Sequence, residues 1–506
     1  MPLTENRFNL VDEPWIPVAG HGLVSLADIF SKPELPSLGG NPIQKIALLK
    51  LVLAIAQSAY TPKDDEDWKQ LGSEGMAEKC LKYLNDKKDL FWLYGEKPFL
   101  QMPAIISTIK GDAKEKNKEP KIIGNGDFPN LSNENNTILL QSEAKNSMSD
   151  AEKALFILTL MSFALAGKQC HCNHKKPAIV GPSLGRVCYL HSFLTGKNIH
   201  ETLYLNLFSL EALYKFRFFE EGLGIPPWEE MPNSSECVIA KKLKKSYLGT
   251  LVSMCRFVLL RDDGIFMMEG LQYKNHKEGW IELSIAVNST GKDIKVLRAN
   301  IVKKPWRELT SLMSFISGRG LFDCPQIAHA LNNAKKHSCK TIQIWSGGLA
   351  VSGDSFGQKV SGTDDFVESE VKLQVSVLGI PWFVNLEQEM EQLDRLVWSL
   401  KSSVYKANKS DVKDSNQRDK RANAISENAE ALFWQLCERK FQNLVDACAS
   451  KKSDEELKKL RKTFAGFVNK AYDTYCPKDT ARQLDAWAAN KPKLARYLIK
   501  TMEGAI

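Results

Sequence analysis

The sequence lacks an apolar run long enough to cross a lipid bilayer. Its longest apolar stretches are Ala154 to Ala166 and Ile46 to Ala56, and Lys50 interrupts the second. Both are shorter than the roughly 18 residues that a membrane-spanning helix needs. The residues that follow Met1, PLTENRFNLVDEPW, contain no apolar core of a secretory signal. We therefore expect core helices, a cytoplasmic location and no membrane partner.

A disulfide framework is also missing. The chain has 11 cysteines, an odd number, which are scattered from Cys80 to Cys476 without a regular spacing. Disulfides persist mainly in oxidising compartments, and small secreted domains space their cysteines in recognisable patterns. The sequence thus indicates reduced thiols.

Known catalytic signatures are absent. The segment GGLAVSGDS (347–355) has the glycine spacing of a phosphate loop, but Asp354 stands where a nucleotide-binding lysine is needed. There is no nucleophile elbow, and His200-Glu201 begins no H-E-x-x-H motif. The acidic run PKDDED (62–67) is typical of an exposed helix start. We expect a protein that is not an enzyme and that needs no cofactor.

A basic segment with cysteines and histidines, Lys168 to Gly196, is the most distinctive stretch of the chain. Its first part contains four possible metal ligands: Cys170, His171, Cys172 and His174. Structural zinc sites usually need a second ligand pair, and here Cys188 and His191 could complete a site only after a sharp fold-back. Lys175 and Lys176, followed by Pro177, instead suit contact with an anionic partner. The alternative function is a metal-dependent nuclease or other enzyme that uses the Cys170–His174 cluster.

Two further segments combine charge with loop-like composition. Residues 108–150 are rich in Lys, Asn, Asp, Gly and Ser, and this composition predicts a mobile loop. Its one apolar island, which we expect to dock on a partner, is Ile138, Leu139 and Leu140. The segment 406–424 is a mixed-charge loop that is either simply solvated or binds phosphate. Its basic residues are Lys406, Lys409, Lys413, Arg418, Lys420 and Arg421.

Periodicity predicts an α+β fold in two parts. Up to about residue 380 we expect a large mixed domain that begins with a hairpin around Gly20–Gly22. Its predicted helices start near residues 42, 66, 305 and 327, and its predicted strands cover 255–260, 280–287, 294–302 and 341–348, with an antiparallel sheet between residues 208 and 305.

Residues 385–506 show four amphipathic segments with loops between them, which predicts a four-helix bundle. This part has 23 Lys and Arg against 18 Asp and Glu, so it carries +5 of the net charge of +8. A net charge of this size shows no partner by itself, because nucleic-acid contact depends on local clustering of cations.

Short motifs occur along the chain in a particular order: NLVDEPWIPV (9–18), IALLKLVLAIAQ (46–57), PFLQ (98–101), GPSLGR (181–186), FLTG (193–196), ETLYLNL (201–207), PPW (226–228), PW (305–306) and WSGG (345–348). With the terminal bundle, they resemble the large subunit of the type I-E CRISPR surveillance complex Cascade, the CasA family. The resemblance covers nearly the whole chain.

The resemblance implies a non-enzymatic subunit for antiviral defence. Such a subunit reads the protospacer-adjacent motif (PAM) of double-stranded DNA from the minor groove, separates the strands, and lets a guide RNA pair with the target. The implied partners are the backbone, small helical and guide-RNA-capping subunits of Cascade, the guide RNA, and a helicase-nuclease that degrades the target.

The resemblance also implies roles for particular residues. The PAM-reading loop falls on Lys175, Lys176, Pro177 and Ala178, and a groove-contacting lysine falls on Lys274 or Lys277. The strand-separating wedge, where the family has larger amide side chains, falls on Ser352, Gly353 and Asp354. The loop with Ile138, Leu139 and Leu140 docks near the guide RNA. Some relatives have a Cys₄ zinc site, but the matching turn RDDGIF (261–266) has no cysteine, so we expect no metal.

Overall fold

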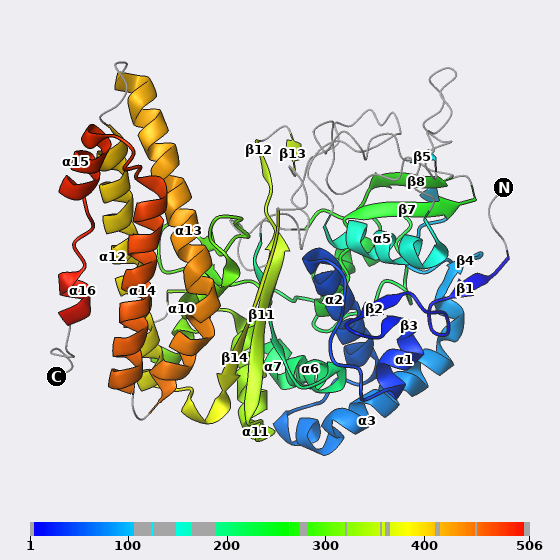
Figure 1. Cartoon of the computed structure of the whole chain (residues 1–506). Helices are drawn as coiled ribbons and strands as arrows, with labels where there is room; N and C mark the ends of the chain where they lie inside the picture. The colour runs from blue at the N-terminus through cyan, green and yellow to red at the C-terminus, as the bar shows by residue number, and fades with distance from the viewer. Residues whose placement is uncertain are drawn as a thin grey trace. The chain divides into compact units, whose positions relative to one another are not determined.

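The computed structural model describes residues 5–105, 123–124, 148–163, 189–262, 264–273, 282–318, 321–354, 357–359, 365–409, 415–450 and 453–499. The chain forms two compact units, and Figure 1 labels their elements. Unit 1 comprises Met1–Leu312 and Leu321–Glu370, and unit 2 comprises Met313–Gly320 and Val371–Ile506. The fold is mixed α+β, as the sequence predicts.

Unit 1 contains helices and small sheets around one apolar helix, α2 (Pro42–Ala59). Its described helices are α1 (Leu26–Ser31), α2 (Pro42–Ala59), α3 (Asp65–Asp86), α5 (Asp150–Ser162), α6 (Ile199–Asn206), α7 (Leu210–Tyr214), α8 (Val238–Leu243), α9 (Tyr247–Leu251), α10 (Leu309–Leu312) and α11 (Pro325–Lys336). The strands β1 (Arg7–Asn9) and β4 (Trp92–Tyr94) pair with each other, as do β2 (Ile16–Val18) and β3 (Gly22–Val24). The β2–β3 pair confirms the predicted N-terminal hairpin.

The central helix of unit 1 is α2. Asn41 caps it by accepting a hydrogen bond from the Gln44 amide, and Pro42 occupies its first turn. The helix packs against α3, α5, α6, α9 and β11 (Thr341–Leu349), so side chains on nearly all its faces are buried. A helix with neighbours on all sides needs no polar face, which explains its continuous apolar sequence. Although α2 is long enough to span a membrane, 78% of it is buried inside the protein, and it is a core helix.

A buried ion pair connects α2 to the segment that follows residue 281. The ammonium of Lys50 lies 2.5 Å from Oε2 of Glu282, and both side chains are almost completely excluded from solvent. The other oxygen of Glu282 accepts hydrogen bonds from the amide and hydroxyl of Ser284. The Ser284 hydroxyl also bonds Nδ1 of His191 at 2.8 Å. A charged network thus replaces apolar packing at the centre of unit 1.

The main sheet has the strand order β14-β11-β6, with β14 at Phe366–Gln374 and β6 at His191–Thr195. Its strands belong to unit 1 except for the end of β14, from Val371. The pair β11–β6 is antiparallel, and Gly347 lies opposite His191. The Tyr189 carbonyl oxygen would lie 2.5 Å from a Cβ at Gly348. The glycine pair therefore lets neighbouring chain segments pack closely, and it belongs to a strand instead of a phosphate loop.

A second sheet has the order β5-β8-β7, with β5 at Ile123–Gly124, β8 at Gly264–Glu269 and β7 at Arg256–Arg261. The antiparallel β7–β8 hairpin matches the predicted strand at 255–260. The short strand β5 lies within the 108–150 segment, where we had expected only a loop. Residues 123 and 124 form a strand because they pair with β8, and the composition of the segment does not predict this pairing.

Several sequence-based boundaries are wrong. The strands expected at 280–287 and 294–302 reduce, in the described residues, to β9 (Val287–Asn288) and β10 (Lys295–Val296). The helix expected at 305–316 is broken into a 3₁₀ turn at Pro305–Glu308, α10, and a second 3₁₀ turn at Ser314–Ser317. Leu283, Ile285 and Leu297 are buried on irregular backbone, whereas Ile301 and Val302 are exposed, so the apolar pattern of these segments does not mark a long strand or helix.

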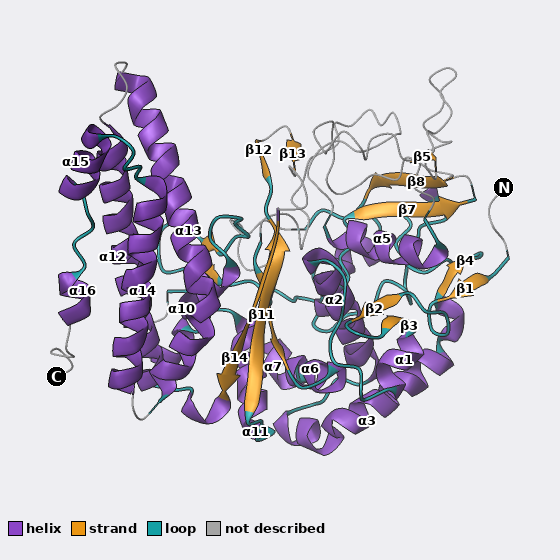
Figure 2. Cartoon of the chain, viewed as in Figure 1, coloured by secondary structure: helices purple, strands orange, loops and turns teal. Residues whose placement is uncertain are grey.

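Unit 2 is built on long helices, which Figure 2 shows in purple. They are α12 (Ile380–Asn408), α13 (Ser415–Ala449) and α14 (Ser453–Tyr475), followed by the short helices α15 (Ala481–Ala489) and α16 (Ala495–Ile499). Each of α12, α13 and α14 packs against the other two. The fourth predicted amphipathic segment is thus split, with α15 on α12 and α16 on α14.

The buried ion pair gives a prediction for stability. Replacing Lys50 with Met leaves the Glu282 carboxylate buried without its cation, and we expect this change to destabilise the protein by about 3–5 kcal/mol. The double variant Lys50→Met/Glu282→Gln recovers much of that loss, because a neutral amide oxygen still accepts from Ser284. Urea unfolding of the full chain measures the stability of the single and the double variant.

The matched control for this prediction is Lys45→Met. Lys45 pairs with Glu368 at 2.7 Å, but the two side chains are 25% and 41% exposed. A partly exposed ion pair contributes less than about 1 kcal/mol. If Lys50→Met lowers the free energy of unfolding no more than Lys45→Met does, the buried pair does not have the central role that we assign to it.

A buried histidine gives a prediction for the pH dependence of stability. The ring of His329 stacks on Phe208 with centroids 4.0 Å apart, and burial lowers the pKa of His329 to about 4. An unfolded histidine titrates near 6.5, so between these values the unfolded chain takes up a proton that the folded chain excludes. This contribution to stability is complete above about pH 6.5 and falls by roughly 3 kcal/mol as the pH drops towards 4.

The variant His329→Phe keeps the ring stack but cannot titrate, so its stability should depend less on pH over this range. Thermal unfolding at a series of pH values measures the effect. Replacement of the exposed His21 with Phe serves as the control. If the stability of His329→Phe depends on pH as steeply as that of the unchanged protein, His329 is not the group responsible.

Candidate nucleic-acid interface

The predicted wedge residues lie in a β-hairpin. Ser352, Gly353 and Asp354 form strand β12 (Ser352–Asp354), which pairs antiparallel with β13 (Gly357–Lys359). Figure 1 shows the hairpin beyond the end of β11, in the same unit. We predicted a turn after the glycine pair, but the chain continues from β11 into the two-stranded ribbon of β12 and β13.

The hairpin brings in residues that the sequence-based prediction missed. Gln358 lies opposite Gly353, and Lys359 lies opposite Ser352. An amide residue, which the family resemblance requires of a wedge, is thus present on the second strand. The sequence carries little signal for this pairing, because the two residues between the strands, Ser355 and Phe356, are not the Asn-Gly or Asp-Gly pair typical of tight hairpins.

The residues expected to read the PAM and to dock near the guide RNA lie outside the described residues. They are Lys175, Lys176, Pro177 and Ala178 of the PAM-reading loop, Lys274 and Lys277, and the docking residues Ile138, Leu139 and Leu140. The Cys170–His174 cluster and Cys188 also lie outside them. These assignments remain predictions.

His191, which we considered as a further metal ligand, is placed by the structure. Its side chain is buried in β6, and its Nδ1 bonds the hydroxyl of Ser284. The ring also packs edge-on against Phe163 at a centroid distance of 5.9 Å. The His191 ring therefore belongs to the core network around Lys50 and Glu282.

The basic residues of the bundle lie mainly on helix ends, and the predicted loop 406–424 is much shorter than expected. Lys406 lies in the last turn of α12 and Lys409 caps its end, whereas α13 already includes Arg418, Lys420 and Arg421. Lys413 lies outside the described residues. Lys406, Lys420 and Arg421 are exposed, and Arg418 is half-buried. The two helix ends thus carry cations accessible to a phosphate backbone.

Lys409 differs from the other cations in this group. Its ammonium lies 3.3 Å from Asp419 and donates to the Tyr405 hydroxyl at 3.1 Å. Hydrogen bonds to Tyr405 and Asp419 raise the pKa of Lys409. Tyr405 also donates to Asp419, so these groups tie the end of α12 to the start of α13. We therefore regard Lys409 as a residue that orders the helix ends.

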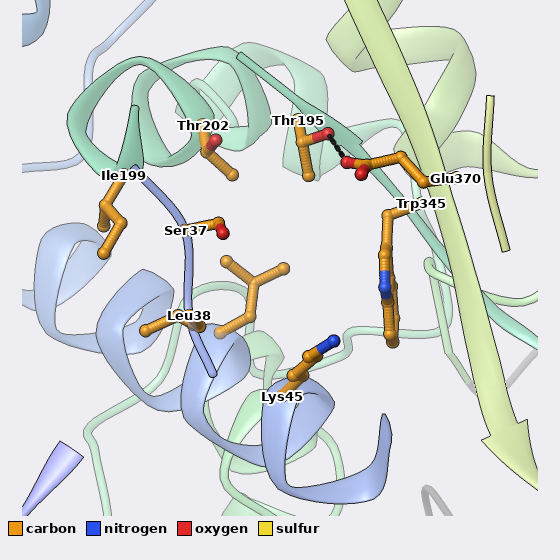
Figure 3. A pocket seen from close by; sticks show the side chains of 9 residues that line it. Ser37, Leu38, Lys45, Thr195, Ile199, Thr202, Trp345 and Glu370 are labelled. Carbon is orange, nitrogen blue, oxygen red and sulfur yellow. Dashed lines mark hydrogen bonds between the residues drawn. The ribbon is translucent and has the colours of Figure 1, made fainter. Parts of the chain in front are cut away.

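An open pocket of about 100 Å³ lies between the main sheet of unit 1 and helices α2 and α6 (Figure 3). Its charged walls are paired internally: Lys45 bonds Glu368, and Thr195 donates to Glu370 at 3.1 Å. The indole of Trp345 also donates to Glu368. The Lys45 ammonium is neutralised by Glu368 beside the lining, and Glu370 adds a carboxylate within it, so the charge of the pocket disfavours phosphate. Its lining residues are Ser37, Leu38, Lys45, Leu49, Thr195, Ile199, Thr202, Trp345 and Glu370.

Comparisons with known proteins agree with this fold and these motifs. The chain is 32% identical over 225 residues to the CRISPR-associated protein CasA/Cse1 of Thermus thermophilus, a match that covers 40% of the chain and 39% of that relative's length. Crystal structures of Thermus thermophilus CasA have TM-scores of 0.71 and 0.69 at 22% identity, and each comparison covers at least 97% of this chain and 99% of the other.

More distant structures share the same fold. The Cse1 structure from Thermobifida fusca has a TM-score of 0.69 at 18% identity and covers 97% of both chains. A chain of a CRISPR RNA-guided surveillance complex has a TM-score of 0.67 at 14% identity, and the comparison covers 96% of this chain and 99% of that one. The family model described as CRISPR-associated protein Cse1 matches residues 9–471. The motif resemblance is thereby confirmed, and the chain belongs to the CRISPR-associated Cse1 (CasA) family.

Proposed function

We propose that this chain is the non-catalytic DNA-recognition subunit of a type I-E CRISPR RNA-guided surveillance complex in the cytoplasm. It reads the PAM in duplex DNA, helps to separate the strands for pairing with the guide RNA, and recruits a helicase-nuclease. The observation that carries the proposal is the match of the Cse1 family model over residues 9–471. Guide-RNA pairing then reads the remaining target sequence.

The β12–β13 hairpin supports a role in strand separation. A two-stranded ribbon is narrow enough to enter between DNA strands, and its backbone pairing keeps it rigid. In this proposal Ser352, Gly353 and Asp354 form one edge of the wedge. Gln358 supplies the amide on the other edge, where it can hydrogen-bond bases that have lost their partners.

PAM reading falls on residues 175–178 and on Lys274 or Lys277. Two adjacent lysines before Pro177 suit an approach to the minor groove, where cations are attracted by the negative potential. The apolar island Ile138–Leu140 is assigned to docking near the guide RNA. These assignments come from the family resemblance and the order of the motifs.

The bundle is proposed to add contacts that do not depend on sequence. Lys406, Lys420 and Arg421 are exposed at the adjoining ends of α12 and α13, and Arg418 and Lys413 extend the set. Their charges suit the phosphates of the displaced strand. The backbone and small helical subunits are the expected neighbours within the complex.

We expect Lys175→Ala/Lys176→Ala to weaken binding of the assembled complex to PAM-bearing duplex by roughly 10-fold or more, because base-reading contacts are worth about 1–3 kcal/mol. Binding to duplex with a scrambled PAM should change much less. Gel-shift titration with both duplexes measures the difference.

The matched control is Lys241→Ala/Lys242→Ala, which removes two exposed lysines from α8. Equal losses for the two double variants would mean that residues 175 and 176 act only through charge. Unchanged affinity for the PAM duplex would remove these residues from the reading loop.

Lys406→Ala/Lys420→Ala/Arg421→Ala should weaken binding to PAM and scrambled duplexes by the same factor. Each lost phosphate contact lowers the slope of log affinity against log salt by about 0.9 for duplex and about 0.7 for single strands. Titrations at several salt concentrations test this. A triple variant of the exposed α14 lysines, Lys458→Ala/Lys459→Ala/Lys462→Ala, has the same charge change and should keep the slope. Equal slopes for the two triple variants would contradict the assignment.

A further inference from the structure

Three side chains with metal-ligating atoms converge in unit 1, and none of them has a role in the proposed reading of DNA. They are Glu201 of α6, and His337 and Cys339 of the segment that follows α11. Oε1 of Glu201 lies 3.9 Å from Sγ of Cys339 and 4.0 Å from Nε2 of His337. One ligand atom from each residue lies within 4.8 Å of the other two.

The backbone after α11 places His337 and Cys339 together. The Cys339 amide donates to the Ala334 carbonyl and the Ser338 amide donates to the Lys335 carbonyl, which is the Schellman arrangement of a helix C-terminus. Ser338 has a φ of 56°, a left-handed conformation that glycine usually occupies at this position. The sharp turn at Ser338 brings the residues on either side of it towards the same carboxylate.

Glu201 is held in place from the other side. Its Oε2 accepts a hydrogen bond of 2.6 Å from the Lys197 amide, which leaves Oε1 directed at His337 and Cys339. A Cβ at Gly196 would lie 2.6 Å from this carboxylate, so the absence of a side chain at Gly196 makes room for it. A fixed carboxylate with one bonded oxygen is the kind of support that surrounds metal ligands in proteins.

We propose that Glu201, His337 and Cys339 bind a zinc-like divalent transition metal, with water as the fourth ligand. Thiolate, imidazole and carboxylate are the zinc ligands of proteins, and the mixed set disfavours calcium and magnesium, which take oxygen ligands. Ligand atoms around tetrahedral zinc lie roughly 3.3–3.8 Å apart, given bonds of about 2.0–2.3 Å. The Cys339–Glu201 separation of 3.9 Å therefore needs to shorten by about 0.3 Å, and the His337–Glu201 separation of 4.0 Å by about 0.6 Å.

Metal-free, the site is held by a weak hydrogen bond. Cys339 donates to Glu201, and burial together with that carboxylate raises the pKa of Cys339 to about 11. A metal ion replaces this thiol proton and releases it to solvent. The His337 side chain is 38% exposed, which leaves the site open to an entering ion.

A bound metal would connect α6 to the start of β11. His337 and Cys339 directly precede β11, and Glu201 follows Gly196 at the end of β6. The ion thus closes one end of the β11–β6 pair, at the opposite end of β11 from the β12–β13 hairpin. We expect a structural site, and it does not depend on the proposed DNA-reading function.

The test uses the full chain in a Cys170→Ser/Cys172→Ser background, which removes the competing thiols of the other cluster. Cobalt(II) titration should give one thiolate-to-cobalt charge-transfer band that zinc displaces, with one equivalent of metal by elemental analysis. Cys339→Ser should abolish the band. His337→Gln and Glu201→Gln should weaken cobalt affinity at least roughly 10-fold. Zinc should raise the unfolding temperature of the background protein and leave that of Cys339→Ser unchanged.

Cys237→Ser is the matched control, because the Cys237 sulfur only caps α8 by accepting from the Ala240 amide and serine can do the same. The proposal is supported if this variant keeps the band and Cys339→Ser loses it. It is overturned if the background protein shows no band, or if the band survives Cys339→Ser. Because His337 is partly exposed, loss of metal in His337→Gln with an unchanged circular dichroism spectrum separates ligand loss from unfolding.

Discussion

The buried pair of Lys50 and Glu282 is the constraint on which unit 1 depends. Two charges leave water only if they meet and their remaining hydrogen bonds are made, and here Ser284 satisfies the second oxygen of Glu282. The pair fixes the rotation of α2, because any other orientation would bury the ammonium against apolar groups. It also fixes the position of the segment 282–287, which has little regular structure of its own.

This constraint extends to the strand that carries the hairpin. Ser284 bonds His191 through its hydroxyl and accepts from the Ser192 amide at 2.7 Å, so the ion pair positions β6. β6 in turn pairs with β11, and the Ser192 and Ser346 hydroxyls bond each other at 2.8 Å. The glycine pair at 347 and 348 then permits close packing before the chain continues into β12. Rigid support from the core thus ends where the proposed wedge begins.

The sequence predicted the parts of the fold that follow from local periodicity. Pro42 and apolar residues at helical spacing predicted α2, and repeating apolar positions predicted α12, α13 and α14. The prediction failed between residues 280 and 316, because that segment is shaped by Glu282, Ser284 and other long-range contacts. Leu283 and Ile285 are buried there without belonging to a long strand, and Ile301 and Val302 are exposed.

The candidate sites were less predictable for the same reason. The hairpin could be inferred only in part, since Gln358 gains its place opposite Gly353 through strand pairing. Glu201, His337 and Cys339 share no motif, and only the packing of α6 against α11 brings them together. Sequence spacing instead drew attention to Cys170, His171, Cys172 and His174. Ligands from distant segments carry no spacing signal, so a site of that kind can be found only from a structure.

Unit 2 uses charge in two separate ways. Inside the bundle, Nε of Arg461 donates to both oxygens of Glu389, at 3.1 and 3.2 Å, which joins α14 to α12 in a single register. The Glu389 carboxylate raises the pKa of Arg461, so the guanidinium stays charged throughout the stable pH range. At the ends of α12 and α13, Tyr405, Lys409 and Asp419 fix the helix termini, and this leaves Lys406, Lys420 and Arg421 exposed beside them. The pairs hold the helices together, and the exposed cations beside them are the ones that the proposed function assigns to phosphate.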